Sequence, residues 1–216
     1  MPLTETTIRS ARSHLRKTDP VMREMIDEVG AFTLRPEKDR FGMLVRSIIS
    51  QQISVSAARS IRSRLEELVL PERVTPESLL RFDLDELRTV GLSQRKASYI
   101  RDLSEKAHDG TVQLRTIGRW SEERVTFELT KVRGIGRWTA QMFLIFALGR
   151  LDVFPEDDLG VRSAIRDRYG LEELPDKTTS LEIARPWRPF ASVASWYCWR
   201  SLDLARNGQS PKKADP

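Results

Sequence analysis

The sequence predicts an all-α fold, and three features lead to that expectation. Apolar residues recur at intervals of three and four along most of the 216 residues, as they do on one face of a helix. Residues that cap helices stand before many of these stretches, often followed by proline or acids. Alternation of apolar and polar residues, which is typical of strands, is almost absent, and only residues 151–154 look extended.

The first half of the chain reads as one helical stretch after another. Helical spacing begins by Thr6, and Asp19 with Pro20 opens a second helix. Residues 41–50 are mostly apolar, and residues 54–70 carry one apolar face. Three further residues are expected to cap the next helices: Thr75, Asp83 and Ser93.

The second half continues the same pattern up to a polar tail. Ser121 is expected to cap a helix, and residues 137–148 are apolar nearly all round, which predicts a buried central helix. Residues 192–204 form the last expected helix. Residues 205–216 are polar and contain two prolines, so we expect this tail to be disordered.

Charge favours one class of partner. Lys and Arg total 36 against 31 Asp and Glu, which gives a net charge of +5. Arginine supplies 28 of the basic residues, and its planar guanidinium binds phosphate through two hydrogen bonds. Nucleic acid is therefore a candidate partner, and a merely arginine-rich solvated surface is the alternative interpretation.

Several other classes are excluded. No apolar run reaches the roughly 18 residues of a membrane span, and residues 1–18 lack the apolar segment of a secretory signal. The single cysteine, Cys198, excludes an internal disulfide and a four-cysteine zinc or iron–sulfur site. His14 and His108 are too far apart in the sequence to form a metal-binding motif. We expect a cytoplasmic protein.

Two glycines form a candidate hairpin in the string T-K-V-R-G-I-G-R-W-T-A at residues 130–140. Gly134 can adopt a positive φ, and Gly136 allows another molecule to approach the backbone. Ile135 would anchor the turn in the core. The N–H groups at the start of the following helix would form a phosphate site. An ordinary helical turn with a glycine cap is the alternative.

An acidic turn, D-V-F-P-E-D-D-L-G, occupies residues 152–160. Asp157 or Asp158 could simply cap the next helix. The seven residues 151–157 reach about 23 Å when extended, and the helix expected at 137–148 rises about 18 Å. The chain can therefore return Asp158 to the hairpin, where a carboxylate beside phosphates would need a functional reason.

The string at 132–140 resembles the helix–hairpin–helix of the DNA glycosylase superfamily, L-P-G-I-G-x-x-T-A, with Arg133 where proline is usual. The resemblance implies two helical subdomains with the active site in the cleft between them. It also implies that the hairpin binds the DNA backbone, through Arg133, Gly134, Ile135, Gly136, Arg137 and Thr139. It further implies a Na⁺ or K⁺ ion on the main-chain carbonyls of Thr130, Val132 and Ile135.

The same resemblance implies an arrangement of the whole chain. The central subdomain would span 39–150 and end in the helix–hairpin–helix at 121–148. The N-terminal helices of 1–38 would pack with the acidic turn and C-terminal helices of 151–204. The tail at 205–216 would stand outside both.

The string D-V-F-x-x-x-D resembles the segment in which this superfamily carries its catalytic aspartate, and Asp158 falls on that position. Breaking an N-glycosidic bond builds positive charge on the deoxyribose. A fixed carboxylate stabilises that charge and can orient or deprotonate the attacking water.

The alkylpurine branch, 3-methyladenine DNA glycosylase II, is the branch that the sequence resembles. Family members that also cut the strand carry a lysine at the position of Trp138, where it can form a Schiff base. Without that amine we expect no lyase activity by this route. One cysteine is also too few for an iron–sulfur cluster, and both facts exclude an endonuclease III-like bifunctional enzyme. Cationic alkylated purines would be flipped out of the duplex and bound by aromatic faces. The expected base pocket contains Trp138, Trp196, Met142 and Leu159, the last two where some members carry tyrosines.

Three further strings agree with this branch. Residues 48–54, I-I-S-Q-Q-I-S, resemble its loop that wedges into DNA, with Gln51, Gln52 and Ile53 at the tip. A polar loop before the next helix is the alternative. Residues 186–197 resemble its P-W-R…W-Y ending, in which Trp187 is expected in the core. Residues 90–97 resemble a smaller turn of the family.

Three hypotheses follow. The first is a monofunctional alkylbase glycosylase, a monomer that needs no cofactor and acts on damaged double-stranded DNA in the cytoplasm with the chromosome. The second is a glycosylase of the same fold for oxidised bases or uracil. The third is a catalytically silent module that only binds DNA. The aspartate, the wedge loop and the aromatic residues favour the first, because a module that only binds DNA needs none of them.

Overall fold

A computed structural model describes residues 3–208, and no β-strand occurs among them. The predicted all-α fold is therefore confirmed for this part of the chain. Residues 209–216 of the expected tail lie outside the described residues. The chain divides into two compact units. We call residues 1–36 with 149–216 the terminal unit, and residues 37–148 the central unit.

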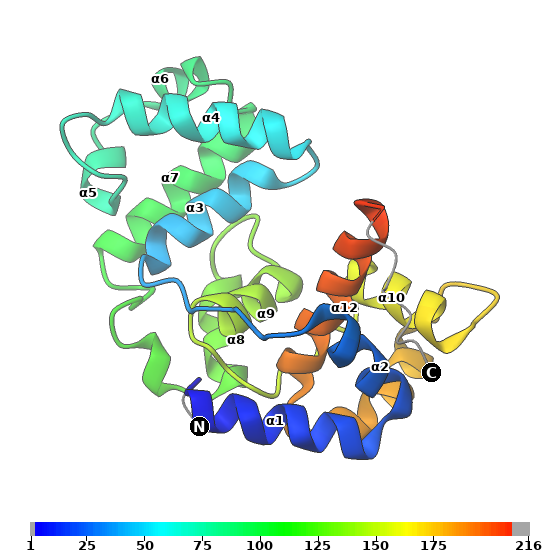
Figure 1. The fold of residues 1–216 in the computed structure, drawn as a ribbon. Coiled ribbons are helices and arrows are strands. Elements are labelled where there is room, and N and C mark those ends of the chain that lie inside the picture. The colour runs from blue at the N-terminus through cyan, green and yellow to red at the C-terminus, as the bar shows by residue number, and fades with distance from the viewer. Residues whose placement is uncertain (1–2, 209–216) are drawn as a thin grey trace. The chain divides into compact units, whose positions relative to one another are not determined.

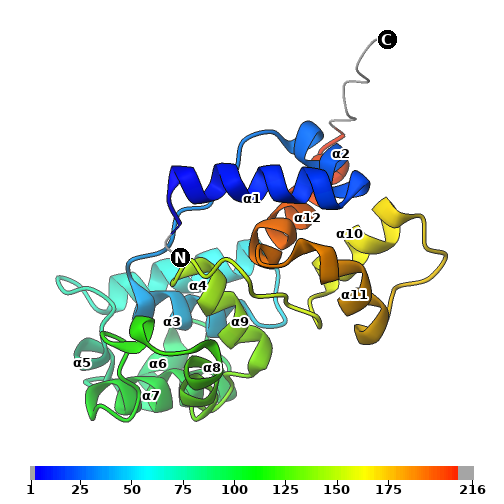
Figure 2. The ribbon, with the colours of Figure 1, turned by 90° about the horizontal axis from the view of Figure 1, so that it is seen from below.

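The terminal unit is built around the last helix of the chain. Figure 1 shows this helix, α12, beside α2 and α10, with α1 packed on α2 and α12. Figure 2 labels α11, which contacts the short 3-10 helix η2. The elements are α1 (Glu5–Thr18), α2 (Pro20–Val29), α10 (Leu159–Tyr169), α11 (Lys177–Ala184), η2 (Arg185–Trp187) and α12 (Ala191–Arg206).

A buried carboxylate ties three elements of the terminal unit together. Asp19 is 5% exposed, and its Oδ1 accepts the N–H of Met22 at 3.0 Å, which caps α2. Its Oδ2 accepts the indole N–H of Trp187 at 2.8 Å and the hydroxyl of Tyr169. Trp187 is fully buried, as predicted. Burial, and then this hydrogen bond to Asp19, raise the pKa of Tyr169 above its ordinary value.

Asp19→Ala is expected to destabilise the terminal unit by about 2–4 kcal/mol. The substitution removes a helix cap and leaves a buried donor on Trp187 and a partly buried one on Tyr169 without this acceptor. Thermal unfolding followed by circular dichroism checks it. Asp27→Ala is the matched control on the same helix, because Asp27 forms an exposed ion pair with Arg16, and it should change stability far less. Equal effects of the two substitutions would contradict the assignment.

The central unit surrounds α3, which contacts α4, α7 and α9 (Figure 1). α5 and α6 pack on α7, and α8 packs on α9. Its elements are α3 (Arg40–Ser50), α4 (Val55–Leu68), α5 (Pro76–Leu79), α6 (Leu84–Thr89), α7 (Gln94–His108), η1 (Ile117–Arg119), α8 (Glu122–Thr130) and α9 (Arg137–Phe146). Residues 139–145 of α9 are all buried, so the predicted buried helix is present.

Two helix ends differ from the sequence prediction. α9 ends at Phe146, two residues before the expected end, because the chain turns into Gly149, which has a φ of +63°. α12 continues through Arg206, two residues into the expected tail, and Gly208 with a φ of +67° follows it. No helix within residues 3–208 combines the length and the apolar character needed to cross a bilayer.

Candidate functional site

The hairpin between α8 and α9 uses its two glycines differently. Gly134 has a φ of +80°, as predicted, and a Cβ there would lie 2.1 Å from a ring carbon of Tyr99. Gly136 has a φ of −97°, caps α9 without a side chain, and has nothing within 4 Å of the place of a Cβ. Gly134 is therefore required by the fold, whereas Gly136 leaves the backbone open to an approaching molecule.

Ile135 anchors the turn between these glycines, as predicted. It is 4% exposed, and its N–H donates to the carbonyl of Val132 at 3.1 Å. A carbonyl oxygen has two lone pairs, so this bond leaves the Val132 carbonyl able to accept a cation as well.

Asp102 holds the hairpin, and sequence reasoning missed it. This residue of α7 is 7% exposed and accepts the backbone N–H of Arg133 at 2.9 Å and the Nε–H of the same residue at 3.1 Å. Lys106 donates to it as well, at 2.7 Å. Arginine is therefore accommodated where the family usually has proline, because the additional N–H has a buried acceptor.

The charge of Asp102 also contributes to stability. Burial alone would raise the pKa of Asp102, but the hydrogen bonds from Lys106 and Arg133 outweigh burial and lower the pKa below its ordinary value. A lowered pKa in the folded state means that this stabilisation is present above the unfolded value, near pH 4. It is lost as the pH falls through the lower, folded value.

The predicted DNA contacts of the hairpin differ in exposure. Arg133 keeps 61% of its side chain exposed while its Nε is bound to Asp102. Arg137 is exposed as well. Thr139 is only 4% exposed, so its side chain is turned into the unit and a contact with DNA would have to use its main chain.

The loop predicted to wedge into DNA is attached to the hairpin. Gln51 donates from Nε2 to the carbonyl of Gly134 at 2.9 Å. Gln52 has a φ of +55°, and no other non-glycine residue of the described chain has a positive φ. This conformation costs roughly 1–2 kcal/mol and is found often at functional sites. Gln52 and Ile53 are exposed, as a wedge requires.

A cavity of about 400 Å³ joins this loop to the start of α9 and to the start of α7. Trp138 is 42% exposed at its edge, and Met142, one turn further along α9, is buried. The turn at residues 90–97, which the sequence singled out, supplies part of the wall. The cavity is lined by Ser47, Ser50, Gln51, Gln52, Ser93, Arg95, Lys96, Tyr99 and Trp138.

The acidic turn lies in the terminal unit and ends at Asp158. The N–H of Asp158 donates to the carbonyl of Pro155 at 2.9 Å, which closes the turn. The carboxylate Oδ1 of Asp158 accepts the N–H of Val161 at 2.8 Å, and so caps α10. Asp158 is 7% exposed. The predicted cap is therefore present, and it holds the carboxylate in one place.

A second helix anchors the start of this turn. Ser192 on α12 donates its N–H to the carbonyl of Leu151 at 3.0 Å. Its hydroxyl accepts the N–H of Val153 at 2.8 Å. Residues 151–154, which looked extended in the sequence, are therefore bound to α12 and belong to no sheet.

Trp199 is a second residue that sequence reasoning missed. Its indole Nε1 donates to Oδ1 of Asp158 at 2.8 Å. Leu159 follows Asp158 and is 65% exposed. Trp196 is only 6% exposed and packs on Phe32, with 4.6 Å between ring centroids. The four predicted pocket residues are thus divided, with Trp138 and Met142 in the central unit and the other two in the terminal unit.

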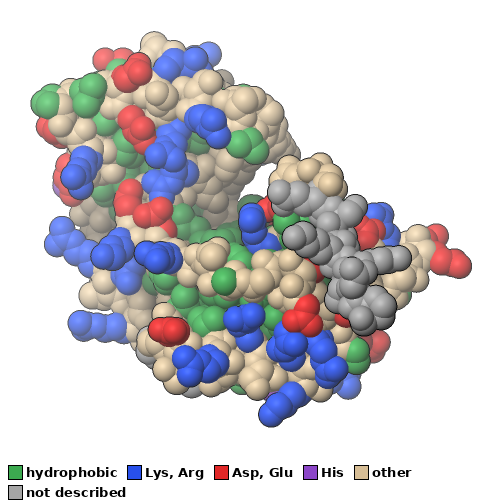
Figure 3. Space-filling model, in the orientation of Figure 1, with side chains coloured by type: hydrophobic (Ala, Val, Ile, Leu, Met, Phe, Trp, Pro, Cys, Tyr) green, Lys and Arg blue, Asp and Glu red, His purple; other side chains and the backbone are tan. Residues whose placement is uncertain are grey.

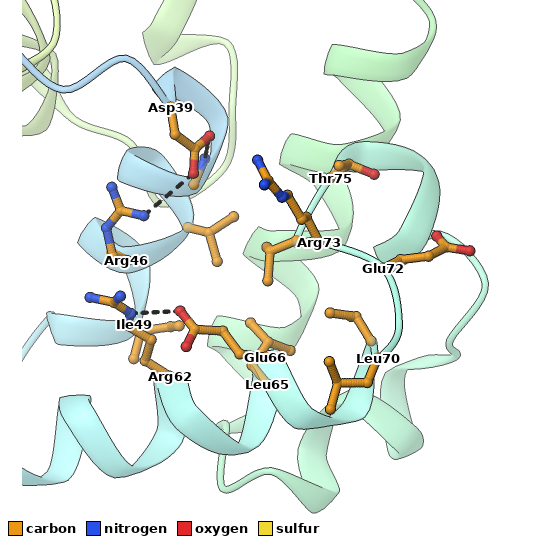
Figure 4. A pocket seen from close by; sticks show the side chains of 14 residues that line it. Asp39, Arg46, Ile49, Arg62, Leu65, Glu66, Leu70, Glu72, Arg73 and Thr75 are labelled. Carbon is orange, nitrogen blue, oxygen red and sulfur yellow. Dashed lines mark hydrogen bonds and ion pairs between the residues drawn. The ribbon is translucent and has the colours of Figure 1, made fainter.

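A larger groove of the central unit is separate from these residues. It measures about 540 Å³ and is lined by parts of α3, α4 and the segment 69–75. Figure 4 shows Arg46 turned toward Asp39, at 3.5 Å, and Arg62 toward Glu66, at 2.8 Å. It contains no predicted site residue, so we assign no chemistry to it.

On the face drawn in Figure 3, surface charge by itself does not locate a phosphate site. Lys and Arg side chains are scattered there with Asp and Glu among them. Within residues 3–208, no group of three His, Cys, Asp or Glu residues is arranged to hold a metal ion. The hairpin, the wedge loop and the acidic turn therefore carry the functional assignment.

Comparison with known proteins identifies the family. The family described as HhH-GPD superfamily base excision DNA repair protein matches residues 45–189. The chain belongs to this superfamily. The match contains the wedge loop, the hairpin and the acidic turn, so the resemblance seen in the sequence is confirmed.

Relatives within the HhH-GPD superfamily specify the branch. The chain is 32% identical to DNA-3-methyladenine glycosylase 1 of Schizosaccharomyces pombe, over 93% of this chain and 90% of that protein. It is 30% identical to the alkylbase DNA glycosidase-like protein mag2 of the same organism, over 93% of this chain and 97% of that protein. These relatives belong to the alkylpurine branch that the sequence resembled.

Solved structures similar to this chain belong to the same branch. The 3-methyladenine DNA glycosylase Mag1 of S. pombe, in complex with abasic DNA, matches with a TM-score of 0.81 and 32% identity. The match covers 91% of this chain and 98% of that one. A DNA-3-methyladenine glycosidase from Bacillus halodurans matches with a TM-score of 0.81 and 33% identity, covering 91% of each chain.

Proposed function

We propose that this protein is a monofunctional DNA glycosylase of base excision repair that removes alkylated bases, of the 3-methyladenine and 7-methylguanine type, from double-stranded DNA. The observation that carries the proposal is Asp158, a nearly buried carboxylate fixed at the start of α10, in a string that resembles the segment of the superfamily's catalytic aspartate. Trp138 in place of the lyase lysine supports hydrolysis without strand cleavage.

The central unit would bind the damaged DNA. Gly136 leaves the hairpin backbone open, so phosphate can approach the N-terminus of α9, where the helix dipole favours an anion. Gln52, which the backbone holds exposed beside the hairpin, would occupy the space that the flipped base leaves. Unstacking a base costs a few kcal/mol, and less for a damaged one.

A monovalent cation is proposed at the same hairpin. The carbonyls of Thr130, Val132 and Ile135 would hold a Na⁺ or K⁺ ion, and the ion would supply positive charge toward a DNA phosphate. Carbonyl oxygen is a suitable ligand for such a hard cation, and the Val132 carbonyl keeps a lone pair beyond its bond to Ile135.

The chemistry would take place at Asp158. An alkylated purine carries positive charge, so it leaves readily with the bonding electron pair when its bond to C1′ breaks. The carboxylate of Asp158 would stabilise the cationic sugar. Water would then bond to C1′ through its oxygen and give its proton to the carboxylate. Trp138, Met142, Leu159 and Trp196 are the proposed base-binding residues.

The protein is proposed to act as a monomer, in the cytoplasm with the chromosome, and to need no cofactor for hydrolysis. The second candidate is a glycosylase of the same fold for other damaged bases. Met142 and Leu159 are the reason to retain this second candidate. They replace tyrosines found in some members and so change the pocket that would select the base.

Release of free methylated bases from alkylated duplex DNA tests the proposal. We expect 3-methyladenine or 7-methylguanine in the supernatant, and a strand that breaks only after alkali. Borohydride should trap no covalent adduct, because Trp138 offers no amine. Duplexes with 8-oxoguanine or uracil are the controls. Preferential release of either control base would favour the second candidate, and DNA binding without any release would favour a silent module.

A further inference from the structure

We propose that Trp199 is a positioning residue that fixes the orientation of the Asp158 carboxylate. This inference rests on the proposed function, because it assigns the role of Trp199 through the proposed catalytic aspartate. Trp199 lies on α12, whereas Asp158 caps α10. The two helices pack against each other within the terminal unit.

Two donors from two different helices meet at one oxygen of Asp158. Oδ1 accepts the backbone N–H of Val161 and the indole Nε1–H of Trp199, each at 2.8 Å. The first bond is the ordinary helix cap. The second comes from 41 residues further along the chain and defines a second direction, so the two together restrict rotation of the carboxylate about its Cβ–Cγ bond.

A glycine makes this contact sterically feasible. At Gly160, a Cβ would lie 3.0 Å from Cδ1 and 3.2 Å from Nε1 of Trp199, and 3.1 Å from Oδ1 of Asp158. The indole therefore lies against the first turn of α10, over a position where a side chain would push it away. The hydrogen bond from Trp199 to Asp158 therefore depends on the absence of a side chain at Gly160.

The donor also matches the charge that the chemistry requires. The indole N–H of Trp199 can only donate, and ionised carboxylate is the form of Asp158 that only accepts. Hydrogen bonds to charged groups are stronger than those between neutral groups. The indole would hold the carboxylate in a fixed position, as electrostatic stabilisation of a cationic sugar demands.

Trp199 is also part of the hydrophobic packing of the terminal unit, so the test must separate packing from positioning. Trp199→Phe keeps an aromatic ring and removes the N–H. We expect its single-turnover rate of base release to fall about tenfold to a hundredfold. Affinity for DNA with an abasic site should stay within about twofold of wild type, because Val161 still donates to Asp158 and keeps the cap of α10.

A double-substitution cycle shows whether the effect passes through the carboxylate. If it does, Trp199→Phe in the Asp158→Asn background should cause no further loss. Gly160→Ala crowds both the indole and Oδ1 of Asp158, so it should slow release in the wild-type background. Trp120→Phe, in the central unit, is the matched control and should leave the rate unchanged.

The outcomes separate the two proposals. A wild-type rate for Trp199→Phe would overturn the positioning role while the glycosylase assignment stands. A full additional loss in the Asp158→Asn background would also overturn it, because Trp199 would then act independently of the carboxylate. A wild-type protein that releases no base would overturn the proposed function, and this inference with it.

Discussion

Asp158→Asn is expected to lower the rate of base release by about a hundredfold to a thousandfold while DNA binding is retained. Removing one preorganised electrostatic contact to the transition state has an effect of this size. Asparagine is as good a helix cap as aspartate, so the fold of α10 should persist. Single-turnover base release and the Kd for abasic DNA, measured on the same preparation, check both parts of the expectation.

Asp157→Asn provides the matched control for this experiment. Asp157 precedes Asp158, is exposed, and is not the cap of α10. Its substitution removes the same unit of charge from the same turn, so it should alter base release by no more than about twofold. Similar losses in the two variants would show that net charge near the DNA matters more than the position of one carboxylate.

Substitution of the two hairpin glycines is expected to affect different properties: alanine at Gly134 should lower stability, whereas alanine at Gly136 should weaken DNA binding. Gly134→Ala should lower stability by about 2–4 kcal/mol. The positive φ strains any other residue, and the added Cβ would collide with Tyr99, whose ring carbon lies 2.1 Å away. Thermal unfolding should show this as a fall in Tm of roughly 2–4 °C for each kcal/mol.

Gly136→Ala should show the opposite pattern. Its φ of −97° suits any residue and nothing lies within 4 Å of the new Cβ, so Tm should stay within about 2 °C of wild type. The methyl group would stand where DNA is proposed to approach the backbone, and we expect the Kd for DNA to rise at least about tenfold. Binding should be compared at one salt concentration, because phosphate contacts weaken steeply with salt. An unchanged Kd would argue against the hairpin as the phosphate site.

Local sequence was sufficient for the helical fold and for much of the candidate site. Helix caps such as Asp19, Ser93 and Asp158 act on an N–H three residues away, so they can be recognised from neighbouring residues. The positive φ of Gly134 and the burial of Ile135 followed from the same local pattern. These features depend on backbone geometry within a few residues, and a single sequence contains that information.

The contacts that orient the site were decided by tertiary structure. Asp102 meets Arg133 across 31 residues, Trp199 meets Asp158 across 41, and Gln51 meets Gly134 across 83. No spacing rule predicts such pairs, because they depend on how helices pack and on which side chains that packing brings within hydrogen-bond distance. The sequence by itself therefore determined most of the helices, several of their caps and the identity of the candidate carboxylate. Only the packing of α10 on α12 and of α7 on the hairpin decided which hydrogen-bond partners hold the site in place.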